Sequence, residues 1–141
     1  MVELVAEKIS VDRILEQLED HSTGGVAIFL GRVRNHAEGR EVEQMDYEAY
    51  PEMALKKMRG IEETAKKRWP VKKMVMVHRT GRLQLGEVSV AIAVACAHRN
   101  EAFEACRFAI DTLKETVPIW KKEYFADGEA WVEGVVPKSS V

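Results

Sequence analysis

The sequence has few of the features that mark secreted, membrane and nucleic-acid-binding proteins. It contains only two cysteines, Cys96 and Cys106, too few for a disulfide framework, so we expect both to be reduced and buried. The longest strongly apolar run, Val88–Ala97, has about half of the ~20 residues that a membrane-spanning helix needs. The formal net charge is −2, so no excess of positive charge favours nucleic acid or an anionic membrane.

The composition is that of one folded domain. Hydrophobic residues make up 46% of the 141 residues and charged residues 31%, which is enough for a sizeable core. We assign residues 1–136 to a single domain and residues 137–141 to a flexible tail. The N-terminus carries Glu3 and Glu7 where a secretory signal would be apolar, so we expect a cytoplasmic protein.

Motifs of several common chemistries are missing. The sequence has no phosphate-binding GxxxxGK[ST] loop, no GxGxxG, no HExxH and no GxSxG. Its four histidines are scattered without the spacing of metal ligands. We therefore expect neither a metal nor a bound cofactor.

Three segments have the apolar periodicity of helices. The first is capped by Ser10 and is expected to stop near Thr23–Gly25. The others are predicted over residues 51–69 and 100–117, each ending at a proline.

Strands are predicted between these helices from alternating or continuous apolar residues. They are expected at residues 26–33, 45–50, 74–78, 87–97, 120–125 and 130–135. The polar segment Asn35–Gly39 is typical of a mobile loop. Pairs of strands separated by helices favour an α+β domain with a largely antiparallel sheet.

Positively charged side chains gather at the ends of the predicted elements, where sites often form. They are Arg32 and Arg34 around Val33, the pair His98 and Arg99, and Lys114 with Lys121 and Lys122. Taken singly, such residues are usually solvated, and a lysine near a helix C-terminus is favoured by the helix dipole. Together they can converge on a small polyanion, because guanidinium groups and helix N-terminal amides suit phosphate oxygens. Trp120 fits either the core or the wall of a pocket for a flat ring.

Five segments of the chain form a recognisable pattern. They are Gly25–Arg34 (GVAIFLGRVR), Tyr47–Tyr50 (YEAY), His78–Gly81 (HRTG), Ala97–Cys106 (AHRNEAFEAC) and Leu113–Glu123 (LKETVPIWKKE). In this order they resemble the large, catalytic subunits of molybdopterin synthase, the MoaE family. The resemblance spans roughly residues 4–135.

The resemblance implies a fold, partners and a reaction. The fold is an α/β hammerhead, and the assembly is a homodimer with one small ubiquitin-like subunit at each end, which makes a heterotetramer. The small subunit carries a thiocarboxylate on its C-terminal Gly-Gly. The synthase, a sulfurtransferase of molybdenum cofactor biosynthesis, uses two such sulfurs to convert cyclic pyranopterin monophosphate (precursor Z) into the dithiolene of molybdopterin. This chain would supply the pocket and not the sulfur.

The resemblance also implies roles for individual residues. Lys114 matches the essential catalytic lysine beside the thiocarboxylate tail, and Lys121 matches the second lysine of the same pocket. Arg34, His98 and Arg99 match positions that bind the substrate phosphate and pterin, some across the dimer. Four flanking residues are expected to assist substrate binding: Arg32, Val33, Lys122 and Glu123.

The residues are compatible with two interpretations of function. One is this synthase, in which Lys114 acts as a base, an acid or a positioning charge, and in which the loop Asn35–Glu41 orders only with ligand. The other is a non-catalytic α+β module that binds an anionic nucleotide or a ubiquitin-like partner. The joint presence of two lysines, His98 and Arg99 favours the enzyme, because a module that only binds a tail has no need of them all.

Overall fold

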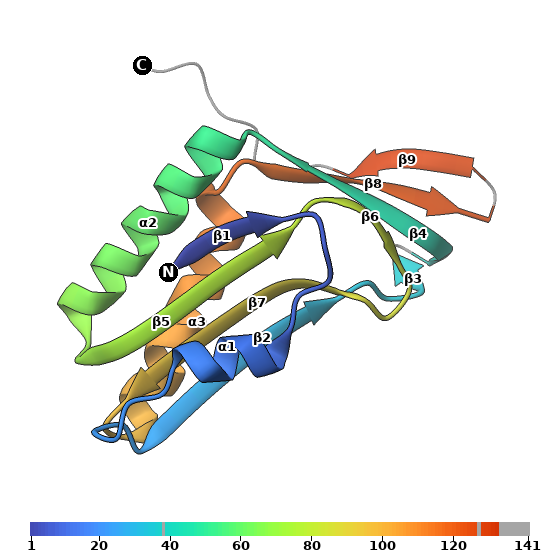
Figure 1. The fold of residues 1–141 in the computed structure, drawn as a ribbon. Helices are drawn as coiled ribbons and strands as arrows, with labels where there is room; N and C mark the ends of the chain where they lie inside the picture. The colour runs from blue at the N-terminus through green and yellow to red at the C-terminus, as the bar shows by residue number, and fades with distance from the viewer. Residues whose placement is uncertain (38, 127, 133–141) are drawn as a thin grey trace.

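A computed structural model describes residues 1–37, 39–126 and 128–132 of the chain (Figure 1). Its helices form where apolar residues recur with helical spacing. They are α1 (Val11–Gln17), α2 (Pro51–Arg68) and α3 (Arg99–Thr116). Ser10 caps α1 as predicted, its side chain accepting a hydrogen bond from the Arg13 amide at 3.3 Å. Helix α1 ends earlier than predicted, at Gln17, and a turn follows in which the Asp20 side chain accepts a hydrogen bond from the Ser22 amide at 2.8 Å.

A four-stranded sheet forms one part of the fold. Its strands lie in the order β1 (Val2–Val5), β5 (Val71–Arg79), β7 (Val88–Cys96) and β2 (Gly25–Arg32). Strands β1 and β5 are parallel, and the other pairs are antiparallel. Strand β7 is buried along most of its length, as its continuous apolar sequence predicts, and β2 lies at an edge.

A second, five-stranded sheet extends away from the helices (Figure 1). Its strands are β3 (His36–Ala37), β4 (Arg40–Ala49), β8 (Ile119–Phe125) and β9 (Gly128–Val132), with β6 (Gly81–Gln84) also paired to β4. All of these pairs are antiparallel. The chain enters this sheet from β2, from β5 and from α3, so elements that meet here come from distant parts of the sequence.

Two clusters of buried side chains stabilise the fold. The larger lies under α2 and α3 and includes Met74 and Met76 of β5. The smaller lies under α1 and includes Val75 and Val77 of the same strand. The two clusters divide these residues because successive side chains of a strand point to opposite faces of the sheet. Both cysteines are free and buried, as predicted.

The predicted class is confirmed: the fold is α+β, with three helices among the described residues and mostly antiparallel strands. Strands β1, β3 and β6 were not predicted, and β3 lies inside the segment expected to be a loop. The end of the last predicted strand, residues 133–135, lies outside the described residues, as does the expected tail at 137–141. No helix in the described part of the chain is long and apolar enough to cross a membrane.

Candidate active site

A pocket of about 160 Å³ opens where the end of α3 meets the second sheet. Its positively charged side chains are Lys114, from the last turn of α3, and Lys121, from β8. The pocket is also lined by Tyr47, His78, Leu113, Val117, Ile119 and Trp120. The two lysines predicted to share a pocket therefore do so.

The way in which α3 ends explains why Lys114 and Lys121, seven residues apart in sequence, line the same pocket. Helix α3 is capped at Val117, because Pro118 disfavours helical backbone in the residue before it. The Pro118 carbonyl accepts a hydrogen bond from the Tyr50 amide, and strand β8 begins at the next residue. Strand β8 then runs antiparallel to β4 and sets Lys121 opposite Tyr47.

The pocket lowers the affinity of Lys114 for its proton. Although the residue as a whole is exposed, the walls of the pocket desolvate its ammonium group and lower its pKa below the usual value. The positive charge of Lys121 lowers this pKa further. Such a lysine gives up a proton more readily than one on an open surface.

Two buried aromatic groups form another wall of the pocket. The rings of Tyr47 and His78 meet edge to face, with centroids 5.1 Å apart. Burial lowers the pKa of His78 to about 4, and the charge of Lys114 contributes, so this imidazole is neutral at physiological pH. Burial raises the pKa of the Tyr47 hydroxyl, and the nearby carboxylate of Glu123 adds to the rise.

Glu123 lies on β8 two residues beyond Lys121, so both side chains project from one face of the strand. Its side chain is almost completely buried, and its Oε1 atom lies 3.9 Å from the Nζ atom of Lys121. The Oε2 atom is buried and has no hydrogen-bond partner within the described residues. Glu123 therefore brings a negative charge to the side of the pocket that holds Lys121.

Lys122 projects from the opposite face of β8. Its Nζ atom lies over the ring of Tyr124, at 5.4 Å from the centroid. The Tyr124 hydroxyl donates a hydrogen bond of 2.7 Å to Asp46, which also accepts two hydrogen bonds from Arg82. The structure thus places Lys122 in a surface cluster and not beside Lys114.

The end of β2 carries the first predicted cluster of cations. Arg32 is paired with Val88 at the start of β7, and His78 is paired with Val90 on the other side of that strand. Arg32 therefore lies at the same end of the sheet as the lysine pocket. Val33 is buried, and the exposed Arg34 follows it.

His98 and Arg99 lie far from Lys114 within one chain. His98 caps the N-terminus of α3 and Arg99 begins the helix, whereas Lys114 is in its last turn. Lys114 lies fifteen positions after Arg99, which is about 22 Å along the helix at ~1.5 Å per residue. A single chain therefore does not bring all the predicted residues together.

The cysteines do not belong to the pocket. Burial raises the pKa of the Cys96 thiol, and it raises that of Cys106 to about 11. The Cys106 thiol donates a weak hydrogen bond to the Ile92 carbonyl inside the core. Neither thiol has the environment of a reactive nucleophile.

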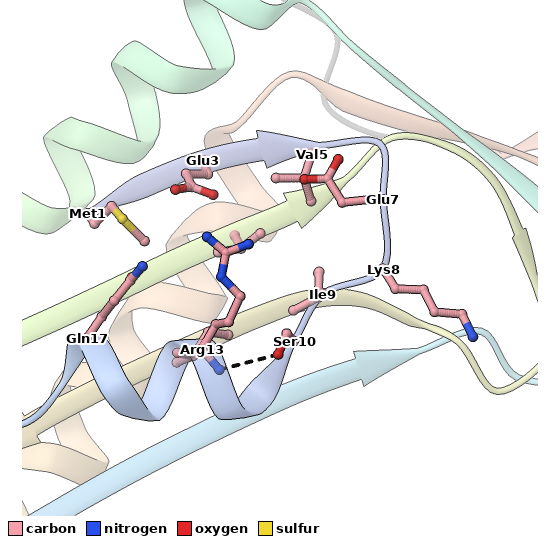
Figure 2. Close-up of a pocket in the computed structure, with 11 residues that line it drawn as sticks. Met1, Glu3, Val5, Glu7, Lys8, Ile9, Ser10, Arg13 and Gln17 are labelled. Carbon is pink, nitrogen blue, oxygen red and sulfur yellow. Dashed lines mark hydrogen bonds between the residues drawn. The ribbon is translucent and has the colours of Figure 1, made fainter.

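A smaller hollow of about 40 Å³ lies between α1 and β1 (Figure 2). Arg13 and Gln17 extend across it from α1 toward β1. A volume of this size holds a few water molecules and not a pterin. Within the part of the chain that the structure describes, no group of three or more histidine, cysteine or acidic residues could hold a metal ion.

Sequence reasoning did not assign Tyr47 and His78 to the pocket. Both lie in segments that resemble the family, but each also fits the apolar alternation of its strand and was consistent with core packing. The pairing of β4 with β8 brings Tyr47 to the pocket, whereas His78 reaches it from β5 in the other sheet, so both positions depend on segments that are distant in sequence. Trp120, for which the sequence left core and pocket wall open, lines the pocket.

The fold and the pocket together define an α+β domain whose pocket carries two cationic side chains. The family model described as "MoaE protein" matches residues 4–116. The molybdopterin synthase catalytic subunit of Pyrococcus abyssi is 43% identical over 128 residues, which cover 91% of this chain and 86% of that protein. The human molybdopterin synthase catalytic subunit is 40% identical over 131 residues, covering 93% and 70% of the two chains.

Solved structures of related proteins share the fold of this chain. The crystal structure of molybdopterin synthase from Staphylococcus aureus superposes with a TM-score of 0.89, at 40% identity, over 93% of this chain and 96% of that one. A complex of subunits 1 and 2 of the molybdopterin-converting factor from Helicobacter pylori shares the fold, with a TM-score of 0.77 at 18% identity. The chain belongs to the MoaE family, and its activity is that of a catalytic subunit of molybdopterin synthase.

Proposed function

We propose that the pocket between α3 and β8 is where this chain transfers sulfur to cyclic pyranopterin monophosphate. Lys114 is the catalytic lysine, and Lys121 is the second lysine of the reaction. The observation that carries the proposal is that both ammonium groups face one pocket and that the pKa of Lys114 is lowered there. The family resemblance assigns essential roles to the same two positions.

The charges of the pocket suit the reaction. Opening the cyclic phosphate and adding sulfur develops negative charge, which fixed ammonium groups stabilise. A lowered pKa also makes Lys114 a better proton donor than a surface lysine. We therefore assign Lys114 to positioning the substrate and donating a proton.

The sulfur arrives on a partner in this proposal. Both cysteines of the chain are buried and their thiol pKa values are raised, so neither is suited to carry it. A small ubiquitin-like subunit with a C-terminal Gly-Gly thiocarboxylate supplies it, in the cytoplasm. A Gly-Gly tail has no side chains, which suits a pocket of about 160 Å³.

A second copy of the chain completes the site. The edge strand β2 exposes apolar side chains, and an apolar groove lies between it and α3, where Phe103 is 65% exposed. Such a surface favours association with another protein chain. Because His98 and Arg99 lie about 22 Å along α3 from Lys114, we place them in the pocket of the other copy. Arg32 and Arg34 reach the substrate from the end of β2.

The test combines the chain with thiocarboxylated small subunit and cyclic pyranopterin monophosphate and measures the oxidised, fluorescent pterin product. Lys114→Ala is expected to abolish product formation while leaving the fold intact. Lys67→Ala, at an exposed position on α2, is the matched control and retains wild-type turnover. Wild-type turnover in Lys114→Ala would refute the assignment of the site. A stable complex of the unmodified chain with the small subunit, but without product, would favour the non-catalytic module.

A further inference from the structure

The arginine segment, Arg32–Arg34, lies at the end of β2, and its middle residue is held on both sides. Val33 is buried in the larger core cluster, between two exposed arginines. Its amide donates a hydrogen bond of 3.0 Å to the Glu87 carbonyl, and its carbonyl accepts one of 2.7 Å from the Gly86 amide. Both peptide bonds that join Val33 to the arginines are therefore fixed by the chain that leads into β7.

The two arginines depend on these contacts to different degrees. Arg32 is still part of β2, where pairing with Val88 holds its backbone. Arg34 follows the end of the strand, so the hydrogen bonds of Val33 set the direction in which its exposed side chain leaves the fold. A guanidinium group on a loose backbone would first have to be ordered by its ligand, at a cost in conformational entropy.

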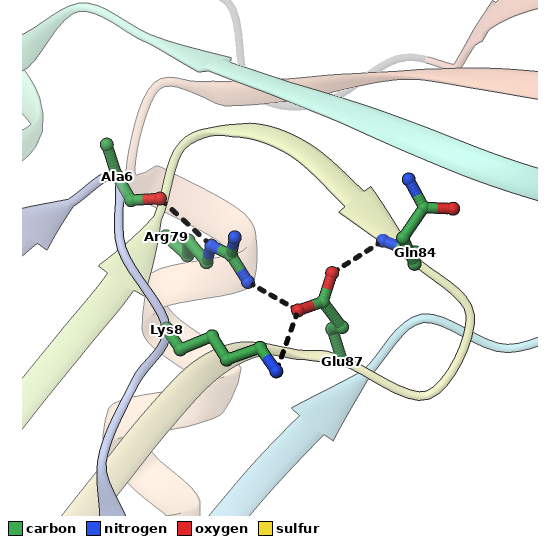
Figure 3. A network of polar contacts seen from close by, with 5 residues as sticks. All are labelled: Ala6, Lys8, Arg79, Gln84 and Glu87. Atoms are coloured by element: carbon green, nitrogen blue, oxygen red, sulfur yellow. Dashed lines mark hydrogen bonds and ion pairs between the residues drawn. The ribbon is translucent and has the colours of Figure 1, made fainter.

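The turn that holds Val33 is closed by a side chain (Figure 3). It runs from Gln84 to Glu87, between β6 and β7, and Gly86 supplies the positive φ of +82° at its third position. The Glu87 amide donates a hydrogen bond of 3.2 Å to the Gln84 carbonyl. The Oε1 atom of Glu87 accepts one of 2.8 Å from the Gln84 amide, so the carboxylate closes the turn a second time.

The second oxygen of the same carboxylate ties the turn to the first sheet. The Oε2 atom accepts a hydrogen bond of 3.0 Å from Arg79 at the end of β5, and it lies 4.0 Å from the Nζ atom of Lys8. Arg79 also donates a hydrogen bond of 3.1 Å to the Ala6 carbonyl, just after β1. The Gln84 amide and then Arg79 lower the pKa of Glu87, so the carboxylate is charged at physiological pH.

We propose that Glu87 is a positioning residue for the reaction: its carboxylate fixes the turn at Gly86, which through Val33 holds Arg34 ready to bind an anionic group of the substrate. The end of β2 and the lysine pocket lie at the same end of the sheet. The effect on turnover rests on the proposed function, in which Arg34 reaches the substrate, whereas the hold on the backbone does not.

Glu87→Gln and Glu62→Gln form a matched pair of variants. Glu87→Gln keeps the size of the side chain but removes the charge that pairs with Arg79. Glu62, on α2, is also a carboxylate with two cationic partners, the Met1 ammonium group and Lys66. The two glutamate side chains are similarly exposed, at 16% for Glu62 and 20% for Glu87. Glu62→Gln therefore controls for the loss of an ion pair away from the arginine segment.

Amide hydrogen exchange, followed by NMR, measures the hold on the backbone. In Glu87→Gln the amides of Val33 and Gly86 are expected to exchange at least tenfold faster, because the turn opens more often. The Gly24 amide, which is hydrogen-bonded at the opposite end of β7, keeps its rate and so separates local opening from global unfolding. Glu62→Gln leaves the amides of Val33 and Gly86 at their original rates.

Steady-state product formation, at saturating small subunit, measures the consequence for the substrate. Glu87→Gln is expected to raise KM for cyclic pyranopterin monophosphate about tenfold with little change in kcat, because binding then has to order the backbone at Arg34. In an Arg34→Ala background the same substitution should leave KM unchanged, since Glu87 acts through that side chain. Glu62→Gln should leave KM unchanged in both backgrounds.

Unchanged exchange at Val33 and Gly86 in Glu87→Gln would overturn the proposal, and so would an unchanged KM. An equal rise in KM with and without the Arg34 side chain would also overturn it, because Glu87 would then act by another route. In the unmodified chain, exchange at these two amides as fast as in an unfolded peptide would do the same, with no variant needed. Wild-type turnover in Lys114→Ala would instead refute the proposed function, while the exchange rates would still decide whether Glu87 holds the arginine segment.

Discussion

The Nζ atom of Lys121 lies 3.9 Å from the Oε1 atom of Glu123, a carboxylate that is only 2% exposed. This pair puts a buried negative charge beside a pocket that holds two ammonium groups. The charge of Lys121 lowers the pKa of Lys114, and the Glu123 carboxylate lies beside the group that carries that charge. The balance of charge in the pocket therefore depends on a residue outside its lining.

Removing that charge is expected to shift the titration of Lys114. Glu123→Gln keeps the shape of the side chain but removes the carboxylate beside Lys121, so the positive charge of Lys121 is felt more strongly and the pKa of Lys114 is expected to fall further. An NMR titration of the chain with ¹⁵N-labelled lysine, in which the Lys114 signal is assigned by its loss in Lys114→Ala, measures this shift. Glu115→Gln, an exposed carboxylate next to Lys114 in sequence, is the control and leaves the titration in place. Equal shifts in both variants would mean that Glu123 has no special influence.

Mixing two inactive variants tests whether the site is shared between copies. Lys114→Ala and Arg99→Ala each disrupt every pocket of their own homodimer. Random exchange makes about half of the dimers mixed, each with one intact pocket, so about one quarter of wild-type product formation returns. Lys114→Ala mixed with Lys121→Ala alters the same pocket and recovers nothing. Absence of recovery in the first mixture, despite subunit exchange seen by native mass spectrometry, would place Arg99 outside the shared site.

Gly24 is needed where the sheet meets the start of α3. A Cβ atom at Gly24 would lie 2.6 Å from the Ala97 carbonyl oxygen, a backbone atom just before His98. Gly24→Ala is therefore expected to destabilise the protein by about 1–3 kcal/mol, measured by urea unfolding. Gly60→Ala is the contrasting variant: its Cβ atom meets open space on α2, so the substitution stabilises the helix by about 0.5–1 kcal/mol. A Gly24→Ala variant as stable as the wild type would show that the backbone there yields easily.

Local patterns predicted the three helices and the family resemblance predicted the lysine pair, whereas pairings between distant segments determined the short strands and the remaining pocket walls. Helix α2 and the end of α3 follow from apolar spacing and the prolines that stop it. Strand β1 has only four residues and exists through its parallel pairing with β5, which no local signal predicts. The position of His78 beside Lys114 likewise depends on how β5, α3 and β8 meet.

The buried His78 makes stability depend on pH. Its pKa is about 4 in the folded chain and 6.5 in the reference state, so the unfolded chain binds a proton that the folded chain does not. Stability is therefore lost as pH falls below 6.5, and the loss continues until about pH 4. Between pH 7 and pH 5 this costs about 2 kcal/mol, so the free energy of urea unfolding should drop by that much more in the wild type than in His78→Gln. His21→Gln, at an exposed position, should keep the wild-type loss, and an equal pH dependence in all three proteins would mean that His78 titrates normally in the folded state.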